Sequence, residues 1–126
     1  MTAVGTTRRR RRGTQAVWWG LPERMSFIVS MVGGVRAADL LHVAPSQVSR
    51  WTSGQEMPRP ETTHRILELD HVLASLIQVW EPEVAGNWLT TANGWLGGAR
   101  PIDVLRTRGS GEVLEAIQAE AAGAYA

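Results

Sequence analysis

The 126-residue sequence contains no cysteine, and all thirteen of its basic residues are arginine. The absence of cysteine excludes disulfides and thiol chemistry and favours a reducing compartment. The most apolar stretch, residues 73–80, is interrupted by Ser75 and Gln78 and is too short to span a bilayer. No apolar secretory segment follows the polar, arginine-rich start. We therefore expect a cytoplasmic protein that does not insert into membranes.

Reactive side chains are scarce and are not grouped as a catalytic site requires. The three histidines, His42, His64 and His71, have no close His-x-x-x-His spacing that would suit a metal ion. The sequence suggests no Ser-His-Asp arrangement either. We expect that the protein is not an enzyme, binds no metal ion and carries no cofactor.

Charge is unevenly distributed along the chain, although the formal net charge is only +1. Residues 1–60 contain nine arginines and three acidic residues, whereas residues 61–126 contain four arginines and nine acidic residues. A basic half is attracted to phosphate and an acidic half is repelled by it. The reversal predicts two faces with two partners, although uneven charge is also common in small proteins.

Apolar residues recur at the spacing of helices, and no useful length of sequence alternates as a strand would. The first apolar face, which follows Pro22, is formed by Met25, Ile28, Val29 and Val32. The predicted helices cover residues 22–32, 35–41, 46–53, 61–80, 83–89, 101–105 and 111–122. The predicted fold class is therefore all-α.

The chain divides into three predicted regions. Residues 1–20 are expected to form a disordered, arginine-rich arm because they are largely polar and have no apolar periodicity. Residues 21–60 form a first helical region. Residues 61–126 form a second helical domain, and the two prolines of residues 55–60 mark the connection.

Within the first region, residues 35–54 have the apolar pattern of two short helices that cross at a tight turn. Ala38 supplies the small residue that a close crossing needs, and Leu41 and Val43 bracket the turn. Val48 and Trp51 lie three residues apart and face inward. The pattern resembles a helix-turn-helix of the Xre/Cro repressor kind, and the alternative is an ordinary pair of packed helices.

The second helix of this pattern leaves polar residues available on its outer face. These candidate DNA contacts are Ser46, Gln47, Ser49, Arg50 and Ser53. Gln47 suits an adenine edge, Arg50 suits guanine or phosphate, and the serines suit phosphate oxygens. His42 stands where such a turn usually has glycine, and histidine is among the residues that tolerate a positive φ.

A run of arginines near the start is a second candidate for contact with DNA. It consists of Arg8, Arg9, Arg10, Arg11 and Arg12. A flexible basic arm can lie along the phosphate backbone or enter a minor groove, which adds affinity without sequence preference. The alternative is a solvated tail with no defined partner.

The second half carries an ordered series of short motifs. The series is Trp88-Leu89, Asn93, Leu96-Gly97-Gly98, Pro101-x-Asp103-x-Leu105, and Gly109 before a last helix with Val113-Leu114 and Gly123. In this order the motifs resemble the toxin-binding domain of the Xre/MbcA/ParS antitoxin family. Together with the upstream helix-turn-helix pattern, the resemblance covers about residues 22–126.

The resemblance implies an antitoxin of a type II toxin–antitoxin system that binds and blocks a NAD-consuming RES-domain toxin. It also implies repression of the antitoxin's own operon through operator DNA, and a homodimer or a larger hetero-oligomer with the toxin. It implies a docking surface that includes Leu96, Gly97, Gly98 and Arg100. It implies a segment that blocks the toxin's active-site entrance and consists of Gly123, Ala124, Tyr125 and Ala126.

Several alternatives stay open. Tyr125 also fits the frayed end of the last helix. The whole chain also fits a stand-alone transcriptional regulator whose second half only dimerises, or an adaptor protein on DNA. Among the six tryptophans, Trp80, Trp88 and Trp95 are expected to wedge between the two halves. Residues 18–19, both tryptophan, suit either a homodimer contact or a cover for the first helix.

Overall fold

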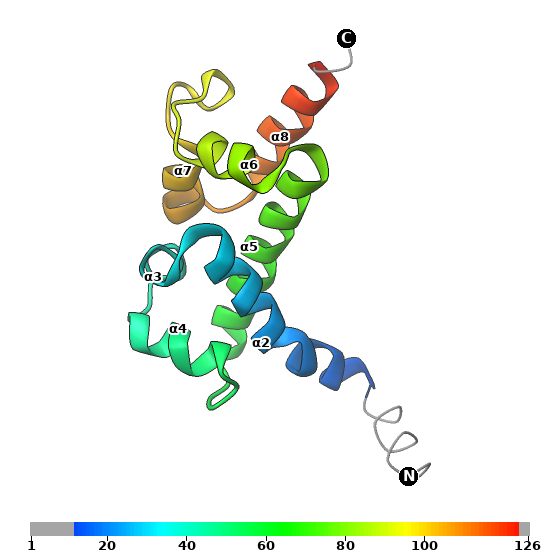
Figure 1. Cartoon of the computed structure of the whole chain (residues 1–126), viewed down its shortest axis with the longest axis vertical. Coiled ribbons are helices and arrows are strands. Elements are labelled where there is room, and N and C mark those ends of the chain that lie inside the picture. The colour runs from blue at the N-terminus through cyan, green and yellow to red at the C-terminus, as the bar shows by residue number, and fades with distance from the viewer. Residues whose placement is uncertain (1–11, 124–126) are drawn as a thin grey trace.

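A computed structural model of the chain describes residues 12–123 (Figure 1). In this range every regular element is a helix, which confirms the all-α fold. The elements are α2 (Arg12–Val32), α3 (Gly34–Leu41), α4 (Pro45–Thr52), α5 (Pro60–Val79), α6 (Pro82–Leu89), the 3-10 turn η1 (Gly94–Leu96), α7 (Pro101–Arg108) and α8 (Gly111–Gly123). None of these helices is both long and apolar enough to cross a membrane.

Helix α2 is longer than predicted, since it begins at Arg12 and contains Pro22 in its interior. Residues 12–20, which we predicted to belong to a disordered arm, are helical. A proline suits the first turn of a helix best, and for this reason we predicted that the helix begins at Pro22. This predicted start is wrong. The arginines at positions 8–11 lie outside the described residues.

Helices α3 and α4 form the compact pair that the sequence predicted. The four residues expected to face inward along these helices are buried: Ala38, Leu41, Val48 and Trp51. His42 ends α3 in the left-handed region at φ 60°, and the amide of Val43 then donates to the carbonyl of Ala38 over 3.0 Å. Pro45 begins α4 at its first turn, where no amide hydrogen is needed.

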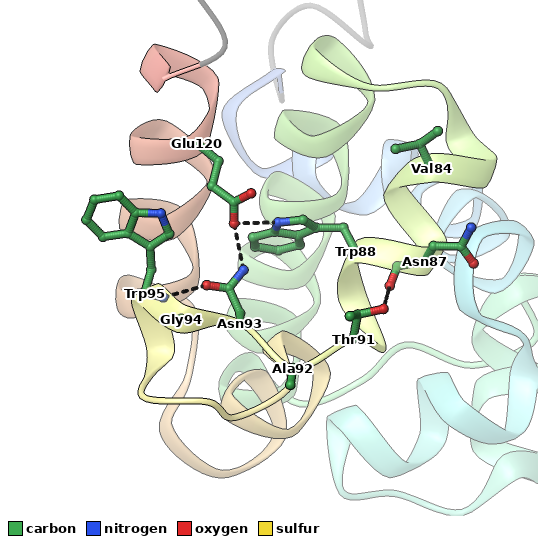
Figure 2. A pocket seen from close by; sticks show the side chains of 9 residues that line it. All are labelled: Val84, Asn87, Trp88, Thr91, Ala92, Asn93, Gly94, Trp95 and Glu120. Carbon is green, nitrogen blue, oxygen red and sulfur yellow. Dashed lines mark hydrogen bonds between the residues drawn. The ribbon is translucent and has the colours of Figure 1, made fainter. Parts of the chain in front are cut away.

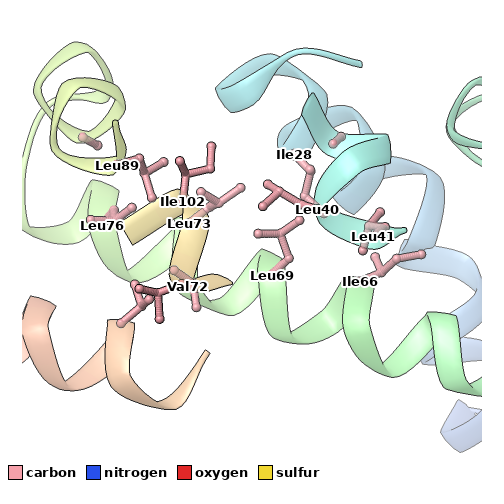
Figure 3. Packing of buried hydrophobic residues seen from close by; sticks show 14 of the residues in the cluster. Ile28, Leu40, Leu41, Ile66, Leu69, Val72, Leu73, Leu76, Leu89 and Ile102 are labelled. Atoms are coloured by element: carbon pink, nitrogen blue, oxygen red, sulfur yellow. The ribbon is translucent and has the colours of Figure 1, made fainter. Parts of the chain in front are cut away.

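Helix α5 is the central support of the molecule. It packs against α2 and α3 in the first half and against α6 and α8 in the second. In Figure 3 its Ile66 and Leu69 lie on the side of α3, whereas Leu76 lies beside Leu89 of α6. All these side chains belong to a single buried cluster that runs through both halves.

The tryptophans of the second half do not share one environment. Trp80 and Trp88 are partly buried against the core and stack on each other, with ring centroids 5.6 Å apart. Trp95 is 67% exposed, so the prediction that it wedges between the halves is wrong. The neighbouring Leu96 occupies the inward position instead and is buried.

Candidate functional sites

The first candidate site is the outer face of α4. Ser46, Ser49 and Ser53 are exposed there, and Gln47 and Arg50 are partly exposed. Three of the five predicted contacts already have local partners, and the partner of Arg50 is described below. The side-chain oxygen of Gln47 accepts a hydrogen bond from the amide of Ala44 over 3.2 Å and so caps α4. The hydroxyl of Ser53 donates to the carbonyl of Arg50 over 3.1 Å.

An acidic residue that the sequence interpretation missed controls the surroundings of Arg50. Nε of Arg50 donates to Oε1 of Glu56 over 2.9 Å, and the indole of Trp51 donates to the other carboxylate oxygen over 3.2 Å. Both charged side chains remain about 40% exposed (43% and 41%). Glu56 therefore holds Arg50 beside α4 and partly compensates its charge.

The turn between α3 and α4 is joined to the second half of the chain. Nε2 of His42 lies 2.9 Å from the carbonyl oxygen of Arg106 in α7, an arrangement in which the ring nitrogen donates. The side chain of Arg106 reaches Asp39 of α3 at 3.6 Å. Arg65 of α5 donates to the carbonyl of Leu41 at the end of α3 over 3.3 Å. These contacts connect α3 with α5 and α7.

The second candidate site is the loop around η1, and Asn93 organises it. Asn93 is the only buried polar residue within residues 20–123. Its amide nitrogen donates to Glu120 of α8 over 2.7 Å, and its amide oxygen accepts from the backbone amide of Trp95 over 2.8 Å. Its own backbone amide donates to Ala99, and its carbonyl accepts from Gly98. One residue thus closes the whole loop.

Glu120 and two glycines complete this loop. The same oxygen of Glu120 that binds Asn93 also accepts from the indole of Trp88 over 2.8 Å (Figure 2). Gly97 and Gly98 both have positive φ, at 67° and 90°, which other residues adopt only with strain. The Asn and Leu-Gly-Gly motifs therefore stabilise the conformation of this loop. Glu120 was not predicted because its partners lie far away in the sequence.

An open hollow of about 690 Å³ lies beside the loop. Its walls come from α6, the η1 loop and the end of α8, and they include Val84, Asn87, Trp88, Trp95 and Glu120. No cluster of histidine, aspartate and glutamate in residues 12–123 is suited to hold a metal ion. The residues that line the hollow are a mixture of apolar and polar side chains, with Glu120 as the one charged residue.

The residues predicted to contact a toxin do not lie in one environment. Gly97, Gly98 and Arg100 are exposed, whereas Leu96 is only 8% exposed and packs into the core. Gly123 is the last residue of α8, and the residues at positions 124–126 lie outside the described part of the chain.

Arg100 and Asp103 form an ion pair at the start of α7. Nε and Nη2 of Arg100 donate to the two carboxylate oxygens of Asp103 over 2.8 and 3.1 Å. These hydrogen bonds hold the pKa of Asp103 below its ordinary value. The pair fixes the direction of the Arg100 side chain where the loop meets α7.

Comparison with known proteins finds relatives for most of the chain. Residues 75–123, which contain all of the η1 loop and α8, match the family described as the antitoxin Xre/MbcA/ParS C-terminal toxin-binding domain. The mycobacterial cidal antitoxin MbcA, from both Mycobacterium tuberculosis and Mycobacterium bovis, is 31% identical over 106 residues. That alignment covers 84% of this chain and 89% of MbcA.

A solved structure shows the same fold. A chain in the crystal structure of the M. tuberculosis MbcT–MbcA toxin–antitoxin complex superimposes with a TM-score of 0.71 at 29% identity. The match covers 84% of this chain and 97% of that chain. The relatives are antitoxins, which supports the expectation that this protein is not an enzyme. The chain belongs to the Xre/MbcA/ParS antitoxin family.

Proposed function

We propose that the protein is the antitoxin of a type II system, that it binds and blocks a NAD-consuming RES-domain toxin, and that it represses its own operon. The observation that carries this proposal is the match of residues 75–123 to a toxin-binding domain, together with the likeness to a chain from a toxin–antitoxin complex. The protein acts in the cytoplasm, as a homodimer or as a larger assembly with the toxin.

The toxin-binding part of this proposal places the contact at the η1 loop and the C-terminal end. Gly97, Gly98 and Arg100 are exposed on the loop and are available to a partner. Leu96 supports the loop from below, since its side chain is buried. The proposed blocking segment is Gly123, Ala124, Tyr125 and Ala126, of which only Gly123, the last residue of α8, lies within the described residues. Tyrosine is common among interface hot spots, which suits Tyr125 to contact with a protein partner.

The DNA-binding part of the proposal treats α3 and α4 as a helix-turn-helix, with α4 in the major groove. Ser46 and Ser49 bind phosphate oxygens, and Arg50 and Gln47 reach base edges. Ser53 lies at the end of the same face. The arginine run at positions 8–12 adds backbone affinity that depends on salt. In Figure 1 α4 lies at the opposite end of the molecule from the end of α8, so the two partners need not compete for one surface.

The toxin-binding part is tested with the RES-domain protein that co-purifies with this chain from its native cells at high salt. That protein is expressed alone, with the full chain, and with a variant that lacks the residues at positions 123–126. We expect the full chain to restore growth and cellular NAD, and the truncated chain to fail. A full chain that does not protect the cells would overturn the proposal in favour of a stand-alone regulator.

The DNA-binding part is tested with the DNA upstream of the protein's own coding sequence. We expect Arg50→Ala to weaken binding in a fluorescence anisotropy titration by about tenfold, the lower range of one good base contact. Arg108→Ala is the matched control because it removes the same charge from α7 in the other half of the chain. Equal losses from both variants would show that α4 makes no specific contact.

A further inference from the structure

Trp95 is the one aromatic residue among the large apolar side chains that are exposed in residues 20–123. It is 67% exposed and lies between two hollows. The first hollow contains Val84, which is itself 47% exposed, and the second runs along α8. A single exposed apolar residue is ordinary, but here an exposed indole and a second exposed apolar side chain line opposite sides of one open hollow (Figure 2), which suits a protein partner.

The backbone beneath this indole is held firmly. The amide of Trp95 donates to the side chain of Asn93, which in turn donates to Glu120 of α8. The next residue, Leu96, is anchored in the core, so Trp95 must point in another direction. In Figure 2 its indole points away from the hydrogen-bonded cluster. A backbone that is already ordered at this position lowers the conformational entropy that is lost when a partner binds the side chain.

The rim around Trp95 is acidic. Glu120 borders the first hollow, and Glu112 and Glu115 border the second. Arg108 is the one basic residue in the second hollow, and it is paired with Glu112 at 3.0 Å. A partner that covers this surface therefore needs an apolar recess with basic side chains around it.

We propose that Trp95 is an anchor of the surface by which this chain binds its toxin, and that it enters an apolar recess with a basic rim on the toxin. The inference rests on the proposed function. All residues that line both hollows lie within the segment that matches a toxin-binding domain, which favours the toxin as the occupant over other proteins. The docking surface thus extends from the exposed loop glycines to the indole and the acidic face of α8.

The test compares Trp95→Ala with the wild-type chain in binding to the purified RES-domain protein by biolayer interferometry. We expect the Kd to rise about 30-fold, as for truncation of an interface hot spot. Val35→Ala is the matched control, because Val35 is 76% exposed but lies on α3 in the other half, and its Kd should not change. Thermal unfolding of both variants should match the wild type, since neither side chain is buried. Glu115→Arg should also weaken binding, because it reverses the charge of the rim.

The outcomes separate the inference from the function on which it rests. If the wild-type chain binds no RES-domain protein, the proposed function fails and the inference fails with it. If the wild type binds and Trp95→Ala binds equally well, only the inference is overturned. Sedimentation velocity on the free chain tests whether a second copy of this chain covers Trp95 instead of the toxin. If Trp95→Ala turns a dimer into a monomer while toxin affinity is unchanged, the indole serves contact between copies and the inference is again wrong.

Discussion

Replacement of Asn93 by alanine should destabilise the protein by an amount that its hydrogen bonds predict. The variant loses the bond to the Glu120 carboxylate and the bond from the backbone amide of Trp95. The first contributes about 1.5 kcal/mol, the lower end for a charged partner because Glu120 is partly exposed, and the second about 1 kcal/mol. The expected loss of unfolding free energy is therefore about 2.5 kcal/mol, a large share of the 5–15 kcal/mol typical of a domain.

Thermal unfolding followed by circular dichroism measures this loss. An unfolding entropy of about 2.1 cal/mol/K per residue corresponds to about 0.26 kcal/mol/K for 126 residues, so Tm should fall by about 10 °C. Asn87→Ala is the matched control, since Asn87 is an exposed asparagine on the neighbouring helix α6 and should change stability by less than about 0.5 kcal/mol. A similar Tm for the two variants would refute the reasoning, because it would show that water replaces both bonds.

Three further predictions concern other parts of the chain. Glu56→Gln should tighten DNA binding about two- to fivefold in anisotropy titrations, because it removes the negative charge that compensates Arg50. Weaker binding would show that Glu56 instead orients Arg50 for contact with DNA. Gly109→Ala should lower the free energy of unfolding in urea by about 1–3 kcal/mol, because φ is 90° at this position. No atom lies within 4 Å of an added Cβ, so backbone strain and not a steric clash is the expected cause. A loss below about 0.5 kcal/mol would contradict this cause. The carboxyl of Asp103 should titrate by NMR below its ordinary pKa and return towards it in Arg100→Ala. A lowered pKa means that the pair stabilises the fold above the unfolded pKa and loses this effect as pH falls through the folded pKa, and an unmoved midpoint in the variant would contradict the assignment.

Helical periodicity explains why the sequence predicted the core of the first half correctly. Ala38, Leu41, Val48 and Trp51 are buried as expected, because residues three or four apart share one face of a helix. The same rule could not place the start of α2. Proline is compatible with the first turn and, at a cost, with the interior, so Pro22 alone does not mark a boundary.

The second site was harder to predict, because its key contacts are not local. Glu120 binds Trp88 and Asn93, which lie 32 and 27 residues away, and no spacing rule connects such positions. In η1 two adjacent apolar residues, Trp95 and Leu96, take opposite environments within one short turn. Only the packing of the loop against α8 determines which of the two is buried. The family motif predicted which segment of the chain forms the site. Only the folded structure shows that Trp95 is the exposed side chain of this segment.

Helix α5 supports both candidate surfaces, because it packs against helices of both halves of the chain. The buried side chains of this helix belong to one cluster with those of α3 and α8, and Arg24 of α2 binds its Asp70 over 2.6 Å. The bond from His42 to Arg106 adds a second connection beside the α3–α4 turn. Because the buried cluster runs through both halves, unfolding of one half exposes apolar surface of the other. The α4 face and the η1 loop are therefore both supported by one buried cluster, even though they lie apart in the molecule (Figure 1).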